Sequence, residues 1–187
     1  MGNREQLLDA AKQCLFDKGY ERTTVRDISE LAGVSKAAIG YHFGSKEALL
    51  NTALFAVLGD GEAGPAPVAE LPPGERVAGL WTDLIRSFAD NRTFWLANLE
   101  SVLVAQRDPQ VREQLAGGLQ QGRSGITAEL TGEPEESLPA DAVRTLGSVQ
   151  MALMGGLLMQ HLTAPEQAPD ATEVLKGIKA LAALIPD

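Results

Sequence analysis

The stretch from Ser35 to Gly44 combines one lysine, one tyrosine and one histidine with small residues, and it contains no acidic residue. Read as a helix, its outward face and the borders of that face consist of Lys36, Ala37, Ala38, Gly40, Tyr41 and His42. A cationic amine attracts phosphate, and small side chains let a helix approach base edges in a major groove. The pattern therefore favours a helix that reads DNA, although an ordinary helical hairpin inside an all-α core has the same spacing.

Two short helices joined by a tight turn are expected to position this face. Thr24 and Asp27 form a capping-box pattern at the start of the first helix. The inward residues are expected to be Val25, Ile28, Leu31 and Ala32 in the first helix, and Ile39 and Phe43 in the second. Gly33 falls where the first helix must end, in a conformation that favours glycine. Ser35 is then expected to cap the second helix.

With the helix before it, this stretch resembles the N-terminal domain of the TetR family of bacterial transcriptional regulators. The matching residues are Thr24, Asp27, Ile28, Ala32, Gly33, Val34, Ser35, Phe43, Lys46 and Leu49. Ser29 stands where alanine is usual, and Gly40 stands where the family most often has a tyrosine that touches DNA. Since glycine costs about 1 kcal/mol of helix propensity relative to alanine, we expect this helix to be looser in the free protein.

The resemblance implies an all-α protein: an N-terminal three-helix helix-turn-helix DNA-binding domain, then a helical ligand-binding and dimerisation domain. It implies a ligand-responsive transcriptional regulator that binds a palindromic DNA operator as a homodimer and is released by a small-molecule effector. We favour a repressor, but an activator fits the same sequence, because the difference depends on where the operator lies.

The DNA-binding residues expected from the match and from the outward face are Thr24, Arg26, Ser35, Lys36, Ala37, Ala38, Gly40, Tyr41, His42 and Lys46. Lys46 matches the family lysine that contacts backbone phosphate. Tyr41 and His42 are both candidates for a base contact, and the sequence does not choose between them.

The formal charge of −9 is unevenly distributed along the chain. Up to Leu50 there are seven basic residues, Arg4, Lys12, Lys18, Arg22, Arg26, Lys36 and Lys46, and seven acidic residues, Glu5, Asp9, Asp17, Glu21, Asp27, Glu30 and Glu47. All the net negative charge therefore follows Leu50. A neutral head can still bind phosphate, while an acidic body limits non-specific binding to nucleic acid.

The 187 residues are expected to form a DNA-binding domain at 1–45, a connecting helix at 46–58, a linker at 59–74 and a helical body at 75–187. The first helix should run from Asn3 to Lys18, and its inward residues should be Leu7, Leu8, Ala11, Cys14 and Leu15. The linker is rich in glycine, proline and small residues. In the body, Asp108 and Pro109 predict the start of a helix interrupted by four glycines, which indicates a kink or close packing.

A homodimer is expected through the helices 140–162 and 172–185. Residues 149–159 are apolar on nearly every side, which predicts a helix with the domain core on one side and a second subunit on the other. An ordinary monomeric core helix is the alternative. We expect this apolar segment to be too short to span a membrane, and we expect no membrane partner.

The effector pocket is expected to draw on Trp81, Phe88, Trp95, Asn98, Gln150, Met151, Met154 and His161. Most of these side chains suit a packed core equally well. Because few polar residues lie among them, the predicted effector is largely apolar.

The chain carries no motif of a common enzyme class. It has two histidines, His42 and His161, no metal-ligand spacing, no P-loop and no nucleophile elbow, so we expect no catalysis, metal or cofactor. The single cysteine, Cys14, excludes an intrachain disulfide framework, and with no apparent signal peptide the protein is expected to be cytoplasmic. Two other interpretations remain: a helical ligand-binding module without DNA affinity, and a helical enzyme that depends on His161.

Overall fold

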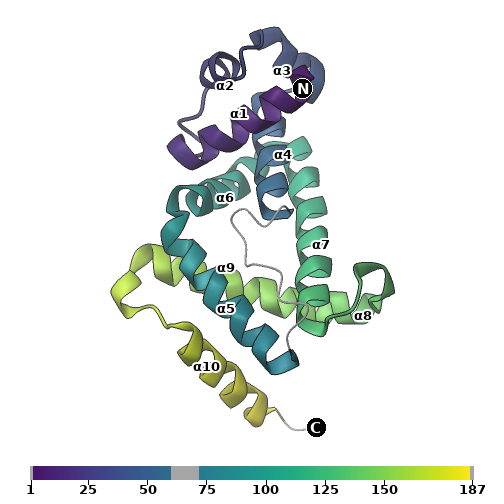
Figure 1. Ribbon diagram of the computed structural model, residues 1–187, viewed down its shortest axis with the longest axis vertical. Helices are drawn as coiled ribbons and strands as arrows, with labels where there is room; N and C mark the ends of the chain where they lie inside the picture. Colours follow the sequence, from purple (N-terminus) through teal and green to yellow (C-terminus); the bar gives the residue numbers. More distant parts are fainter. Residues whose placement is uncertain (1, 60–71, 186–187) are drawn as a thin grey trace. The chain divides into compact units, whose positions relative to one another are not determined.

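The computed structural model describes residues 2–59 and 72–185, and within these ranges it contains helices and no strand. The helices are α1 (Asn3–Lys18), α2 (Val25–Ala32), α3 (Lys36–Phe43), α4 (Lys46–Gly59), α5 (Pro73–Asp90), α6 (Arg92–Ala105), α7 (Pro109–Thr131), α8 (Ala140–Ala142), α9 (Ser148–Thr163) and α10 (Ala171–Leu184) (Figure 1). The all-α class expected from the sequence is confirmed. Residues 60–71 of the predicted linker lie outside the described residues.

The chain divides into two compact units. The first unit comprises residues 1–63 and 91–120, and the second comprises residues 64–90 and 121–187. The first unit holds α1 to α4, α6 and the beginning of α7. The second holds α5, the end of α7 and α8 to α10.

In the first unit, α1 packs against α2, α4 and α6. Its bounds are those predicted, and it ends at Gly19, whose φ of 80° lies in the region that favours glycine. The buried residues are Leu7, Ala10, Ala11, Cys14 and Leu15, so Ala10 takes the inward place predicted for Leu8, which is half-buried. Desolvation in this core raises the pKa of the Cys14 thiol, which therefore stays protonated at neutral pH.

The predicted helix-turn-helix is formed by α2 and α3. The Thr24 hydroxyl accepts a hydrogen bond from the Asp27 backbone N–H at 3.1 Å, and the Asp27 carboxylate accepts one from the Thr24 backbone N–H at 2.9 Å. The capping box is thereby confirmed. Gly33 ends α2 in the left-handed conformation, with φ 65° and ψ 25°.

Two local predictions about this motif are wrong. Leu31 is 56% exposed, because α2 buries its Ile28 and Ser29 side instead. Ser35 occupies the N-cap position of α3, but its side chain makes no capping hydrogen bond. Its hydroxyl is therefore available to another acceptor or donor.

The long helix α7 is continuous through all four of its glycines. It begins as predicted, since the Asp108 carboxylate accepts hydrogen bonds from Gln110 N–H at 2.9 Å and Val111 N–H at 3.2 Å. A Cβ added at Gly118 would collide with the ring of Phe55 on α4. Close packing therefore explains Gly118, whereas neighbouring Gly117 faces open space.

In the second unit, α9 is the end of a continuous helix from Ala140 to Thr163 that includes a π-helical stretch at Val143–Gly147. It packs against α5, which also contacts α10. By length and composition alone this 24-residue helix, which contains the apolar segment 149–159, could cross a membrane. This is weak evidence, because core helices of soluble proteins have the same length and composition.

Candidate nucleic-acid interface

The outward face of α3 is exposed, as its spacing predicts. Lys36, Ala37, Gly40 and Tyr41 are exposed, and Ala38 and His42 at the borders are half-buried. Tyr41 is 86% exposed, and its ring meets that of His42 edge-on at 4.9 Å. An aromatic side chain this exposed contributes almost nothing to the core of its own chain and is accessible to another molecule.

The opposite face of α3 is held by packing of Ile39 and by a contact between Arg4 and Phe43. Ile39 is 2% exposed. The guanidinium of Arg4, at the start of α1, lies 5.1 Å from the centre of the Phe43 ring. Such an arrangement is a cation–π contact, which holds the end of α3 against α1.

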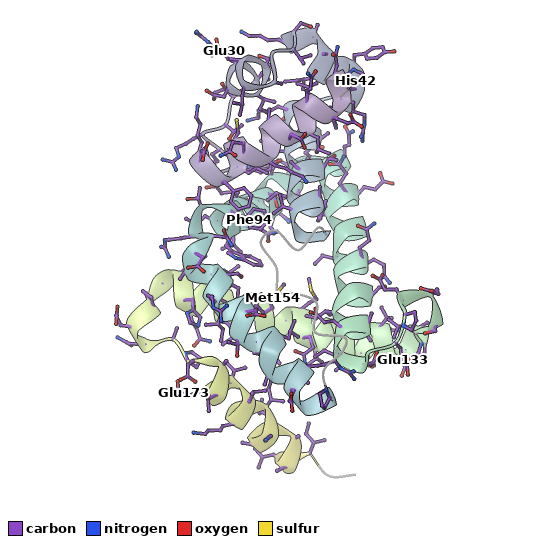
Figure 2. The ribbon with its side chains drawn as sticks, in the orientation of Figure 1. Glu30, His42, Phe94, Glu133, Met154 and Glu173 are labelled. Carbon is purple, nitrogen blue, oxygen red and sulfur yellow. The ribbon has the colours of Figure 1, made fainter. Side chains whose placement is uncertain are left out.

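The acidic side chains of α2 have basic partners. The amine of Lys18 donates to Asp27 Oδ1 at 2.6 Å, and the guanidinium of Arg26 donates to Glu30 Oε1 at 2.6 Å. Hydrogen bonds from Lys18 and Thr24 lower the pKa of the Asp27 carboxyl, and the bond to Asp27 raises the pKa of Lys18. The negative charges of Asp27 and Glu30 are thus largely neutralised by their basic partners. Figure 2 labels Glu30 on α2 and His42 on α3.

Lys36 is the cation of this face with the greatest freedom. It is exposed on α3 and takes part in no ion pair within the described part of the chain. Arg26 is also exposed but already bonded to Glu30, so it must exchange that partner to reach a phosphate. Both partners of that pair are largely solvated, which makes the exchange inexpensive.

Lys46 has a structural partner that the sequence did not indicate. Its amine donates to the backbone carbonyl of Thr23 at 3.2 Å and lies 3.5 Å from Glu47 Oε1. The side chain is 22% exposed, so the amine is partly covered. Because an ammonium has three N–H donors, Lys46 can hold the turn before α2 and still donate to a phosphate.

Gly40 is in open space. A Cβ built on it would meet no atom within 4 Å, so nothing inside the chain requires glycine there. Absence of a side chain at this exposed position leaves room for a surface from another molecule to approach the α3 backbone.

A contact between α6 and the start of the reading motif was missed from the sequence. The carboxylate of Glu100 accepts a hydrogen bond from the Glu21 backbone N–H at 3.0 Å, and Thr93 lies near Gly19. The 79 residues that separate Glu21 from Glu100 leave no local signal for such a contact. It ties α6 to the loop from which α2 starts.

The predicted effector residues fall in both units. Trp81, Phe88, Gln150, Met151, Met154 and His161 belong to the second unit, and Trp95 and Asn98 belong to the first. The Phe88 and His161 rings lie 5.5 Å apart, and His161 Nε2 is 3.1 Å from the carbonyl oxygen of Pro169. That carbonyl is an ordinary structural partner for His161.

Trp95 packs in the core of the first unit. Its ring meets Phe94 edge-on at 5.6 Å, and Phe94 stacks on Phe16 of α1 at 5.4 Å (Figure 2). A shallow open hollow at the end of α9 contains none of the predicted effector residues, and it is lined by Met159, Gln160, Thr163, Ala164, Gln167 and Ala168.

Comparison with known proteins identifies the family of this chain. The N-terminal family model for bacterial regulatory proteins of the TetR family matches residues 7–53, and the model for a tetracyclin repressor-like C-terminal domain matches residues 72–184. The chain belongs to the TetR family of transcriptional regulators.

Curated relatives agree with this assignment. The HTH-type transcriptional regulator BetI of Rhizobium meliloti is 32% identical over 163 residues, which cover 84% of this chain and 77% of that protein. The HTH-type transcriptional repressor Rv1474c of Mycobacterium tuberculosis is 34% identical over 107 residues, which cover 57% of this chain and 52% of that repressor. The protein is accordingly a DNA-binding transcriptional regulator of the TetR family and not an enzyme.

Solved structures share the fold. A protein from a Rhodococcus species assigned to the TetR-family regulators has a TM-score of 0.70 at 24% identity, with 96% of this chain and 97% of that chain covered. The multidrug-binding protein EbrR, whose structure contains proflavin, has a TM-score of 0.61 at 22% identity, with 96% and 99% covered. At these identities the likeness concerns the fold alone.

Proposed function

We propose that this TetR-family protein is a cytoplasmic repressor that binds a palindromic DNA operator as a homodimer and releases it when a small molecule occupies the helical body. The observation that carries the proposal is the outward face of α3. It joins an unpaired Lys36 and an 86% exposed Tyr41 to small residues, on a helix without an acidic residue. Such a face can enter a major groove.

The proposed DNA contacts are divided by chemistry. Lys36, Lys46 and Arg26 would bond to phosphates, since they carry positive charge, and Thr24 and Ser35 would add hydroxyl donors near the starts of α2 and α3. Tyr41 or His42 would read bases, while Ala37, Ala38 and Gly40 allow the close approach that reading requires. Phosphate contacts position the protein, and base contacts specify the sequence.

A homodimer is supported by apolar side chains left exposed in the single chain. They are Val149 and Met159 on α9, and Leu181, Leu184 and Ile185 at the end of the chain, each more than half exposed. A two-fold dimer through α9 and α10 would cover them and present two α3 helices to half-sites about 34–36 Å apart, or a multiple of that spacing.

Selection of bound duplexes from a random DNA pool by the purified protein tests this function. We expect recovery of a palindrome, with half-sites separated by a whole number of helical turns. Recovery of single, unpaired half-sites would contradict the dimer. Absence of any retained duplex at low salt would contradict DNA binding and favour a ligand-binding module without DNA affinity, since electrostatic attraction to phosphate is strongest there.

A small-molecule effector is proposed from the body of the protein. The second unit carries Trp81, Phe88, Met151 and Met154 on α5 and α9, which pack together. EbrR, a protein of the same fold, was crystallised with proflavin. A ligand that binds the operator-free form more tightly must weaken DNA binding by the same factor, because the coupling between two sites is reciprocal.

A further inference from the structure

Three helices of the second unit touch each other in pairs. The Arg76 guanidinium of α5 donates to the carbonyl oxygens of Leu130, at 3.3 Å, and Thr131, at 2.6 Å, at the end of α7. The π-helical stretch that leads into α9 approaches α7 so closely at Gly147 that an added Cβ would lie 2.7 Å from the carbonyl oxygen of Arg123. The ring contact between Phe88 and His161 joins α5 to α9, and Figure 1 shows these two helices crossing each other. We call this arrangement the three-helix junction.

Each helix of the three-helix junction contributes a polar atom that is buried and lacks a partner. These atoms are Trp81 Nε1 on α5, Arg123 Nε on α7 and Gln150 Oε1, and none has a hydrogen-bond partner within residues 2–59 and 72–185. Trp81 is 0% exposed and Gln150 is 7% exposed. Buried polar atoms of folded proteins are almost always satisfied, so three on adjoining helices indicate a partner from outside the chain.

Along their helices, the three residues fall at or between the positions whose contacts join the helices. Trp81 falls between Arg76 and Phe88 along α5, and Gln150 falls between Gly147 and His161 along the long helix. Arg123 lies at the contact between α7 and Gly147, the residue before α9. Two methionines of α9 lie on the same helices, since Met151 lies beside Gly122 of α7 and Met154 follows one turn later (Figure 2).

The chemistry of these groups favours an anion with more than one acceptor. Trp81 and Arg123 both offer N–H donors, and the Arg123 charge has no ion pair in the described part of the chain. A half turn of the Gln150 amide exchanges its oxygen for its N–H₂ group, so this residue can also donate. A carboxylate accepts from several donors at once and pairs well with a guanidinium.

We propose that the three-helix junction binds the carboxylate of an otherwise apolar organic acid, and that such an acid is the effector. The Arg123 guanidinium neutralises the charge, the Trp81 indole and the Gln150 amide donate to the carboxylate oxygens, and the methionines contact the apolar part. This inference rests on the proposed function, because it names the ligand class that weakens DNA binding.

Calorimetric titration of the full-length protein with decanoate, 1-decanol and decylamine tests the ligand class, because these probes share one chain length and differ in the head group. We expect decanoate to bind about tenfold or more tightly than decanol, since a hydrogen bond to a charged group is stronger than one between neutral groups. Decylamine should bind most weakly, because the Arg123 guanidinium repels its ammonium group. Decanoate should also reduce retention of the selected duplex. Equal affinities for the three probes, or no binding of decanoate, would overturn the proposal.

Variants locate the site. Arg123→Gln should abolish the preference for decanoate over decanol, whereas Arg144→Gln, which changes an exposed arginine of the long helix, should preserve it. Gln150→Leu removes a buried unpartnered group, so it should unfold at no lower a temperature than the parent and yet bind decanoate less tightly. Preserved decanoate preference in both Arg123→Gln and Gln150→Leu would overturn this location.

The two proposals fail in different ways. Duplex retention is measured without any ligand, and decanoate binding is measured without DNA. A protein that retains its duplex but does not prefer decanoate contradicts the inference alone. One that prefers decanoate but retains no duplex contradicts the proposed function and leaves the carboxylate site in place.

Discussion

At the scale of single residues, Lys46 has two possible effects on DNA binding that can be separated. As a phosphate contact it contributes directly, and through its bond to the Thr23 carbonyl it holds the turn that precedes α2. We expect Lys46→Ala to weaken binding to every duplex sequence and to reduce the slope of log affinity against log salt by about 1. Electrophoretic titrations at four salt concentrations measure both quantities.

A reduced affinity with an unchanged salt slope would assign Lys46 a positioning role alone. Lys12→Ala is the matched control, because it removes a lysine of α1 outside the predicted contact set. Its salt slope should equal that of the parent protein.

Gly40 tests whether DNA approaches α3 closely. Since an added Cβ meets nothing inside the chain, Gly40→Ala should raise the free energy of unfolding by roughly 1 kcal/mol, the difference in helix propensity. If the α3 backbone lies against DNA, the same methyl group should lower operator affinity. Thermal unfolding and duplex binding are measured on the same variant. Equal or tighter DNA binding would show that Gly40 lies away from the groove.

The control for Gly40 is Gly117, which also lies within a helix and in open space. Gly117→Ala should raise stability by a similar amount, roughly 1 kcal/mol, and leave DNA affinity unchanged.

The ionisation of Asp27 makes the stability of the helix-turn-helix depend on pH. Its pKa is lower in the folded chain, mainly through the hydrogen bond from Lys18, than the value of about 3.9 usual for an unfolded chain. Ionised Asp27 therefore stabilises the fold at neutral pH, and this contribution is lost as the pH falls through the folded pKa. We expect Asp27→Asn to unfold at a lower temperature than the parent at pH about 7, and the two melting temperatures to converge in acid.

Melting temperatures followed by circular dichroism across the acid range measure that convergence. Asp9→Asn, a change on the exposed side of α1, is the control and should follow the parent curve. A constant difference between Asp27→Asn and the parent at every pH would contradict the linkage.

At the scale of helices, two adjacent glycines of α7 should respond in opposite ways to the same substitution. Gly118→Ala forces a methyl group into the Phe55 ring of α4 and should cost about 1–3 kcal/mol of unfolding free energy, a typical value for overpacking. Chemical denaturation of this variant beside Gly117→Ala measures the contrast. Similar values for the two would mean that α4 and α7 separate without penalty.

The same pair shows what the sequence can and cannot determine. Local signals predicted α1 within its observed bounds, the Thr24–Asp27 capping box and the Asp108 cap, because each depends on residues a few positions apart. Packing decides the rest. Nothing local distinguishes Gly117 from Gly118, or indicates that Leu31 faces solvent and that Lys46 reaches the Thr23 carbonyl.

The same distinction between local signals and packing applies to the residues of the candidate interface. The exposed face of α3 follows from helical periodicity, so its residues could be chosen from the sequence. The hydrogen bond from Glu21 to Glu100 and the contact of Arg4 with Phe43 join elements distant in sequence, and they required the fold. After the predicted linker, the sequence predicted a group of aromatic and sulfur-containing residues. It did not indicate that Trp95 packs in the core of the first unit, or that Trp81 Nε1 is buried without a hydrogen-bond partner.

At the scale of the whole molecule, the proposed dimer rests on apolar side chains of α9 and α10 that are more than half exposed in the single chain. In a two-fold interface every residue occurs twice, so one substitution changes both halves of the contact. We expect Leu181→Glu to convert a dimer into a monomer, because two carboxylates would be buried without partners. Sedimentation velocity measures the mass, and binding to the selected palindrome should weaken by more than about tenfold once the two heads bind separately.

Leu103→Glu is the matched control, since Leu103 is 66% exposed on α6 and Leu181 is 58% exposed on α10. Both variants replace an exposed leucine by one negative charge, so a difference in their oligomeric state reflects the position of the residue rather than the net charge. A dimeric Leu181→Glu would place the interface elsewhere. A monomeric parent protein that still selects a palindrome would mean that DNA itself assembles the two subunits, and the exposed residues of α9 and α10 would then meet only on the operator.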